Sequence, residues 1–283
     1  MCIVAIAWQL FDELPLVLLS NRDEFLQRPT DTLHQWSDKS IYAGRDCQSG
    51  GTWLGIHQEL QQEPNQQIMQ QTPQATYHQN GRWAAVLNFR DGVQASSNER
   101  SRGELVADFL TSTMSPMAFA RQINLQDYAG FNLIIGDRKQ AVIVNNRGHA
   151  PTLLYAGLHV FSNGQPEEGW FKTERLRGRL RQEVLPLIAE DSSPEYWQEA
   201  AFSVLSDNTK APTDRLPNTG VDIAIEQALS SIYIEPVALA NLETTMPNYG
   251  TRTQSILTLR HESAVNSQIS AELMSHEIVY NNF

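Results

Sequence analysis

Residues 2–25 read CIVAIAWQLFDELPLVLLSNRDEF, and this stretch decides how the rest of the chain can fold. Two apolar runs, at residues 2–8 and 16–20, flank turn-forming residues at 12–15, so we expect a hairpin of two antiparallel strands. In such a hairpin the end of the second strand lies beside the start of the first. The polar residues 21–24, which follow the second run, are therefore expected close to Cys2.

Cys2 is the first candidate for chemistry. A small second residue permits removal of Met1, which would leave a thiol and a free α-amine on one residue. The thiol is the most nucleophilic common side chain, and an amine with a pKa of about 7.7–8.0 can take its proton at neutral pH. The alternative is that Cys2 is a small buried hydrophobic side chain, as free cysteines most often are.

The charged run at residues 21–24 also has two interpretations. Charged side chains rarely follow a buried strand without a partner, so Asp23 could hold the Cys2 amine or tune its thiol. Alternatively, the run is a polar turn with surface ion pairs.

Composition excludes several classes of function. The 283 residues carry a formal charge of −11, which argues against a broad nucleic-acid-binding face. Two cysteines, Cys2 and Cys47, exclude a disulfide framework, and we assign Cys47 no role. The seven histidines show no metal-like pairing, so we expect neither a metal site nor a cofactor.

Targeting signals are also not evident from the sequence. The apolar start lacks a basic segment before it and soon meets acidic residues, unlike a signal peptide. No run approaches the roughly 18 apolar residues of a membrane span. We therefore expect a cytoplasmic, soluble protein without stable membrane insertion.

The remaining pattern predicts strands, then helices, then strands, helices and further strands. Ser101 and Glu104 form a capping box that opens the first helix, and Ser115-Pro116 opens the second. Further helices are predicted at 170–188 and 194–205. Further strands are predicted at 41–44, 52–57, 83–89, 131–136, 141–145, 159–162, 231–235, 253–259 and 277–280. This order predicts an α+β fold with helices on the outer faces of two stacked antiparallel sheets.

Two segments stand out from this pattern. Residues 58–80 hold nine glutamines and predict a solvated loop insertion without a chemical role. The helix predicted at 170–188 is unusually basic for an acidic protein, and it is either a solvated face or an anion-binding rim. No repeat or linker divides residues 1–283, so we expect one domain.

An ordered series of motifs runs along nearly the whole chain outside the Gln-rich segment. These are MCI (1–3), NRDEF (21–25) with Arg28-Pro29, GGTWLG (50–55), NFR (88–90), SRGEL (101–105), GFNLI (130–134), NRG (146–148), FSN (161–163) and YGTRT (249–253). Together they closely resemble the NRDE family, also called the transport and Golgi organisation 2 (TANGO2) family. The resemblance implies the N-terminal-nucleophile (Ntn) hydrolase superfamily and its four-layer αββα sandwich.

A second resemblance suggests roles for the site residues. Choloylglycine hydrolases and penicillin V acylases are similar at Cys2, Asp23, Asn88, Asn163 and Arg252. The similarity implies that Cys2 attacks a carbonyl, Asp23 orients the amine, and the Asn88 backbone N–H and Asn163 amide stabilise the oxyanion. Arg252 and Arg22 would favour the neutral amine and the thiolate. Those enzymes carry an arginine where this chain has Ser20.

Two functions remain open at this point. The first is a cysteine hydrolase acting on an amide or related acyl bond of a small molecule. The second is a non-catalytic binding or trafficking protein for haem, acyl-CoA or lipid, since eukaryotic members of the resembled family are connected with these ligands. Asn21, Arg22 and Trp53 are the candidates for ligand binding, although a tryptophan such as Trp53 is more often part of the core.

Overall fold

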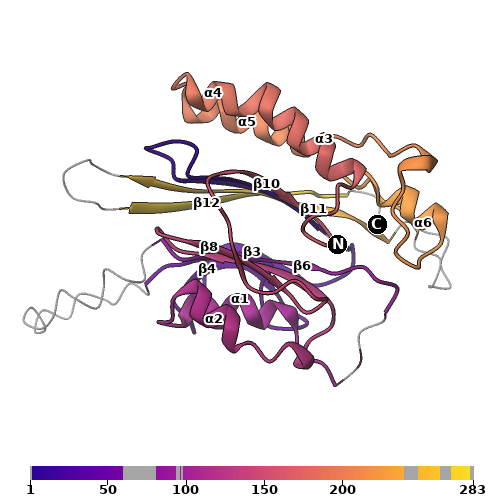
Figure 1. Ribbon diagram of the computed structural model, residues 1–283, viewed down its shortest axis with the longest axis horizontal. Coiled ribbons are helices and arrows are strands. Elements are labelled where there is room, and N and C mark those ends of the chain that lie inside the picture. The colour runs from indigo at the N-terminus through magenta and orange to yellow at the C-terminus, as the bar shows by residue number, and fades with distance from the viewer. Residues whose placement is uncertain are drawn as a thin grey trace, which may run out of the picture.

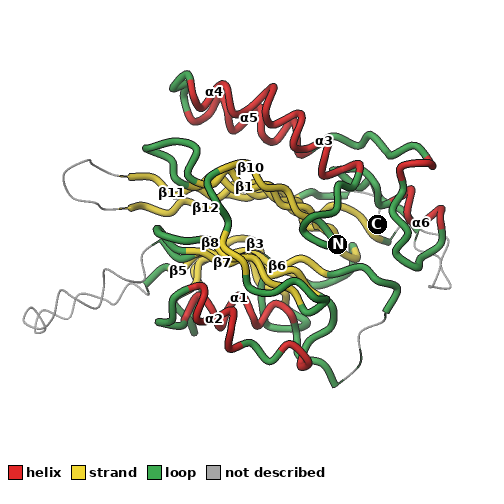
Figure 2. Tube along the Cα trace, in the orientation of Figure 1, coloured by secondary structure: helices red, strands yellow, loops and turns green. Residues whose placement is uncertain are grey.

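The computed structural model describes residues 2–59, 81–93, 96, 98–238, 248–261 and 269–280. Two antiparallel sheets stack face to face, and helices cover the outer face of each sheet (Figures 1 and 2). The predicted α+β sandwich, with four layers in the order αββα, is thus confirmed.

The five-stranded sheet contains the hairpin predicted at the start of the chain. Its order is β10-β1-β2-β11-β12, so β1 lies between β10 and β2. Cys2 pairs with Arg22 across the hairpin, as expected from two adjacent antiparallel strands. The strands are β1 (Cys2–Trp8), β2 (Leu16–Phe25), β10 (Gly157–Phe161), β11 (Tyr249–His261) and β12 (Ile269–Glu277).

The seven-stranded sheet follows the chain order from β3 to β9, each strand pairing with the next. It is therefore an antiparallel meander, in which a helical segment at residues 89–130 joins β6 to β7. The strands are β3 (Thr30–Gln35), β4 (Ile41–Asp46), β5 (Leu54–His57), β6 (Trp83–Asn88), β7 (Phe131–Gly136), β8 (Ala141–Asn145) and β9 (Thr152–Leu153).

The helices divide between the two outer faces (Figure 1). On the seven-stranded sheet lie α1 (Arg102–Thr111) and α2 (Pro116–Gln122), and Ser101 caps α1 by accepting a hydrogen bond from the Gly103 N–H. On the five-stranded sheet lie α3 (Phe171–Arg179), α4 (Leu185–Ala189) and α5 (Pro194–Leu205). A π-helical turn at Leu180–Val184 joins α3 to α4, and α6 (Ile223–Ala228) follows later. Pro186 explains the π turn, because it lacks an N–H and crowds the preceding turn.

Strand β1 is buried along its whole length because both of its faces are covered. Alternate side chains from Cys2 to Trp8 enter the core between the two sheets. The intervening side chains, Ile3, Ala5 and Ala7, pack under α3 and α5. The continuous apolar run at residues 2–8 thus reflects a strand at the centre of the sandwich.

Several predicted boundaries differ from the structure. Strand β2 continues through Phe25, so the NRDE residues are part of the strand and the alternative of a polar turn is wrong. Residues 231–235 are not a strand, although Ile232 and Ile234 are fully buried, because their apolar pattern belongs to an irregular segment packed beside β11. The last strand, β12, ends at Glu277, where the predicted strand began.

The sequence patterns did not predict β3, β9, most of β12, or α6. Strands β3 and β12 are the edges of their sheets and expose much of their surface, which weakens the apolar alternation. The Gln-rich insertion predicted at 58–80 lies outside the described residues from residue 60 onward. No helix within the described ranges has the length and apolar character needed to cross a bilayer.

Candidate functional site

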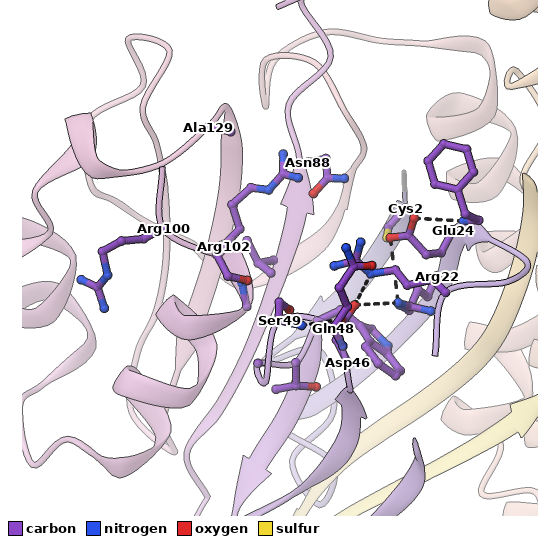
Figure 3. Close-up of a pocket in the computed structure, with 18 of the residues that line it drawn as sticks. Cys2, Arg22, Glu24, Asp46, Gln48, Ser49, Asn88, Arg100, Arg102 and Ala129 are labelled. Carbon is purple, nitrogen blue, oxygen red and sulfur yellow. Dashed lines mark hydrogen bonds and ion pairs between the residues drawn. The ribbon is translucent and has the colours of Figure 1, made fainter. Parts of the chain in front are cut away.

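A cavity of about 700 Å³ opens at one end of the sandwich, between the two sheets. The five-stranded sheet contributes Cys2 and the end of β2, and the seven-stranded sheet contributes Asp46 and Asn88. The first turn of α1 closes another side. Figure 3 shows Cys2 beside Arg22 and Glu24, with Asn88 and Arg102 on the opposite wall. The size is typical of small-molecule sites.

Cys2 is the first residue of β1, and its thiol faces the space between the sheets. The residue is 8% exposed, so a ligand must enter the cavity to reach it. Burial raises the pKa of the thiol, and the charge of Asp23 raises it further. Arg22 and a hydrogen bond with the backbone of Asp23 act in the opposite direction. The thiol therefore needs a base or a cation nearby to react at neutral pH.

Asp23 is a buried carboxylate held by strand β11. Its Oδ1 accepts a hydrogen bond of 2.6 Å from Thr251 Oγ1, and its backbone carbonyl accepts one of 2.7 Å from the Tyr249 hydroxyl. Burial raises the pKa of Asp23 to about 6, against the favourable effects of Lys172 and Thr251. The register explains this position, because Thr251 pairs directly with Asp23.

Asn163 follows β10, the neighbour of β1, and connects the five-stranded sheet to the opposite sheet. Its Nδ2 donates to the Asn88 carbonyl at 2.8 Å, and its own carbonyl accepts from the Arg90 N–H at 2.7 Å. The Ser162 hydroxyl lies 3.1 Å from both the Cys2 carbonyl oxygen and Asn163 Oδ1. The predicted pair of Asn88 and Asn163 is thus brought together on the side of Cys2.

Lys172 was not predicted as a site residue. It lies in the first turn of α3, only 1% exposed, and its Nζ is 3.4 Å from Asn163 Oδ1. Burial lowers its pKa to about 8, while the charges of Asp23 and Cys2 favour its ammonium form. A sequence signal did exist: Lys172 shares helical spacing with Leu176 and Leu180, both of which are buried.

Arg22 and Trp53 form one wall of the cavity together with Asp46. The Arg22 guanidinium lies 4.3 Å from the centroid of the Trp53 ring, and its Nη2 donates to Asp46 Oδ2 at 3.2 Å. Arg28 Nε donates to the same oxygen at 2.5 Å. Asp46 Oδ1 also accepts the backbone N–H groups of residues 48 and 49, so this carboxylate organises the loop and both arginines.

Two predicted site residues are engaged elsewhere. The Asn21 carboxamide, 0% exposed, donates to the carbonyls of Leu205 and Ile232, on the opposite face of β2 from Arg22. The Arg252 guanidinium donates to the carbonyls of Phe25 and Arg28. Arg252 thus braces the connection after β2, and the structure does not bring its guanidinium to the Cys2 thiol.

The basic helix is explained by ion pairing. Arg175 and Arg179 both contact Asp207, at 2.6 and 3.0 Å, and burial of Asp207 is outweighed by these bonds and by Thr209, so its pKa falls to about 2. Arg179 also pairs with Glu183 at 2.6 Å. These contacts support the interpretation of a solvated, ion-paired face over that of an anion-binding rim.

The loop at residues 50–52 is a tight turn that docks on α1. Gly50 has a φ of +74°, which favours glycine, and the Thr52 N–H donates to the Gly103 carbonyl at 3.3 Å. A Cβ on Gly51 would lie 2.5 Å from the Gly103 carbonyl carbon, so glycine is needed there for close approach. This contact places Ser101 and Arg102 at the cavity.

Within the described part of the chain, no group of three or more His, Cys, Asp or Glu side chains could hold a metal ion. The cavity is lined by the Cys2 thiol, the Asp23 carboxylate and Asn88, whereas Asn163 is bonded to Asn88, and Lys172 to Asn163, outside the lining. Such a set fits acyl transfer, which needs a nucleophile, a proton acceptor and hydrogen-bond donors for an oxyanion.

Comparisons with known proteins give the family. The model of the Transport and Golgi organisation 2 family matches residues 1–269. The chain is 32% identical to a transport and Golgi organization protein 2 homolog of Bos taurus over 256 residues, covering 86% of this chain and 81% of the relative. It is 30% identical to the Homo sapiens homolog over the same shares, and 26% identical to the Drosophila melanogaster protein over 89% and 84% of the two chains. The chain therefore belongs to the transport and Golgi organisation 2 (TANGO2) family.

Proposed function

We propose that this protein is a cytoplasmic N-terminal-nucleophile cysteine hydrolase that cleaves an amide or related acyl bond of a small molecule. The observation that carries the proposal is the position of Cys2, which lines the cavity at the first residue of β1. Removal of Met1 would place the α-amine on the same residue as the thiol. The family and the αββα sandwich support this proposal.

The proposed reaction follows from the groups around Cys2. The thiol loses its proton to the α-amine, and Sγ attacks the carbonyl carbon of the substrate. Asp23 orients the amine by accepting its hydrogen bond. The amine then gives the proton to the leaving group, and water hydrolyses the thioester to release the acid and restore the thiol.

Asn163 and Asn88 are the proposed oxyanion donors. One hydrogen of Asn163 Nδ2 is used by the Asn88 carbonyl, and the second is the proposed donor to the oxyanion. The backbone N–H of Asn88 is the other donor. Removing one such donor typically costs about 2.7–4 kcal/mol of transition-state stabilisation.

An activated acyl probe tests the proposal without knowledge of the natural substrate. The purified protein is incubated with a small thiol-reactive acyl ester, and the labelled peptide is identified by mass spectrometry. We expect acylation of Cys2, and its loss in the Cys2→Ala variant but not in the control Cys47→Ala, because Cys47 lies outside the cavity. Acylation confined to Cys47 would contradict the proposal.

A second candidate is a binding protein for an acidic ligand such as haem or acyl-CoA. It is favoured by the arginines that line the cavity, among which Arg102 donates to the Gly130 carbonyl at 3.2 Å and can still face a ligand. Equilibrium titration with haem and with acyl-CoA separates the two functions. Tight binding that the Cys2→Ala substitution leaves unchanged, without hydrolysis, would favour binding over catalysis.

A further inference from the structure

Lys172 is a buried cation whose place in the fold requires an explanation. Lysine is almost never fully buried without compensation, because removing an ammonium group from water is costly. Lys172 is 1% exposed, and its Nζ contacts the neutral Asn163 Oδ1 at 3.4 Å. A leucine or methionine would fill this position on α3 at lower cost, so the charge itself is the feature to explain.

The charge acts on the residues proposed for chemistry. The Asn163 Oδ1 that Lys172 contacts lies 3.1 Å from Ser162 Oγ, which is also 3.1 Å from the Cys2 carbonyl oxygen. At this site Asp23 and Cys2 both favour the ammonium form of Lys172. The attraction between opposite charges acts on both partners, so the ammonium favours the Asp23 carboxylate and, less than Arg22 does, the Cys2 thiolate. The effect on Asp23 is visible, since Lys172 opposes the rise in its pKa caused by burial.

We propose that Lys172 is a positioning residue of the Cys2 site, which holds the Asn163 carboxamide in place and favours the thiolate form of Cys2. The inference rests on the proposed function for its catalytic meaning, although the effect on the thiol can be measured without any turnover. Lys172 thereby takes the thiolate-favouring role that the resemblance to choloylglycine hydrolases gave to Arg252 together with Arg22. The Arg252 guanidinium instead donates to the carbonyls of Phe25 and Arg28.

The contact with Asn163 carries the structural half of the proposal. Lys172 has donors and no acceptor, so its contact with Asn163 fixes the carboxamide with Oδ1 toward the lysine. Nδ2 must then point toward Asn88, as observed at 2.8 Å. With the opposite orientation, an oxygen would face the place where the proposed oxyanion forms, and it would repel the developing charge.

The electrostatic half concerns the thiol. Burial raises the pKa of Cys2, and Asp23 raises it further, so cations are needed to offset both effects. Lys172 approaches from the helix layer, whereas Arg22 belongs to β2. The titratable and charged groups that face Cys2 or Lys172 from the surrounding elements are Asp23, Arg22, Arg90, Arg102, Glu226 and Tyr249.

The test is the pH dependence of Cys2 alkylation by iodoacetamide. It uses the full chain carrying Cys47→Ala, so that Cys2 is the remaining cysteine. Lys172→Met removes the charge and the hydrogen bond, whereas Lys172→Gln removes the charge but keeps a donor for Asn163. The matched control is Lys210→Met, because Lys210 is exposed. Circular dichroism and thermal unfolding establish that each variant is folded.

We expect the midpoint of Cys2 alkylation to move to higher pH in Lys172→Met and Lys172→Gln, and to stay unchanged in Lys210→Met. A folded Lys172 variant with the wild-type midpoint would overturn the inference. The proposed function has a separate test, because absence of Cys2 acylation in the wild-type protein would contradict it. The alkylation midpoint of the Lys172 variants does not depend on that acylation, so the two proposals can fail independently.

A second measurement uses the wild-type lysine and does not depend on the folding of a variant. The chain contains four lysines, so the side-chain NMR signal of Lys172 can be assigned and titrated. We expect Lys172 to titrate with a pKa of about 8, because burial disfavours its ammonium form. A titration at its ordinary value of 10.5 would contradict its burial beside the Cys2 site.

Discussion

At the scale of single residues, the site holds a buried carboxylate, Asp23, and a buried ammonium group, Lys172. Burial disfavours the charged form of each. The pKa of Asp23 is raised to about 6 and that of Lys172 is lowered to about 8, in each case mainly by burial. Each group nevertheless favours the charged form of the other. Such opposed shifts are common at functional sites, where stability is given up to place charge beside a reacting group.

The first prediction concerns stability against pH. The folded pKa of Lys172 lies below its ordinary value of 10.5, so between pH 8 and 10 the unfolded chain binds the additional proton. The contribution of Lys172 to the free energy of unfolding must therefore increase with pH, by up to about 1.4 kcal/mol per pH unit. Urea unfolding across this range should show the free energy of unfolding of wild type rising with pH relative to that of Lys172→Met. Parallel curves would show that the lysine is not buried as described.

The second prediction concerns Thr251. Its hydroxyl donates to Asp23 Oδ1 at 2.6 Å and accepts from the Ile234 N–H at 2.8 Å. Thr251→Val keeps the shape and removes both bonds, which should cost about 1–3 kcal/mol for each buried group that loses its partner. The pKa of Asp23 should also rise above about 6, moving the acid limb of Cys2 acylation to higher pH. Chemical denaturation and the pH profile of probe labelling measure the two effects.

Thr253→Val is the matched control, because Thr253 lies on the same strand but donates to Glu277 rather than to Asp23. The acid limb should stay at the wild-type pH in this variant. An equal shift of the acid limb in both variants would show that the hydrogen bond to Asp23 does not set the pH at which acylation is lost.

At the scale of elements, the cavity depends on how closely α1 approaches the loop before β5. The loop and the helix meet through two glycines, Gly51 and Gly103, with almost no space between their backbones. The cap at Ser101 and the first helical residue, Arg102, are brought to the cavity by this contact. The GGTW motif thus has a packing role, and it shapes the site without contributing a chemical group.

The third prediction compares two adjacent glycines. A Cβ on Gly51 would lie 2.5 Å from backbone of Gly103, so Gly51→Ala must displace α1, at a cost of about 1–3 kcal/mol. Gly50→Ala is strained by the φ of +74° but has open space around it, at a cost of about 1–2 kcal/mol. The stability losses are therefore similar, whereas the rate of Cys2 acylation should change only in Gly51→Ala. Equal rates in both variants would contradict a role of this contact in shaping the cavity.

At the scale of the whole molecule, the sequence predicted the architecture from its buried strands. Residues 2–8, 83–89 and 131–136 were identified because strands covered on both faces are apolar along their length. The edge strands β3 and β12 were not identified, since half-exposed strands mix polar and apolar residues. At 231–235 a strand was predicted and is absent, because the buried isoleucines of this irregular segment give the same apolar pattern as a strand.

The site was predicted less completely, because a sequence shows residue types but not which groups meet. The hairpin placed residues 21–24 beside Cys2 by register alone, and the motifs indicated Asn88 and Asn163. Lys172 and Thr251 come from elements far along the chain, and their contacts depend on layer packing. The direction of the Arg252 side chain likewise depends on the carbonyls exposed after β2.

The most direct test of the central claim is the mass of the N-terminal peptide after the purified full-length protein has reacted with the acyl probe. The account predicts that this peptide begins at Cys2, that Met1 is absent, and that the acyl group is attached to the Cys2 thiol. A peptide that retains Met1 in most molecules and carries no acyl group would contradict the account, because the amine needed as the base would not exist.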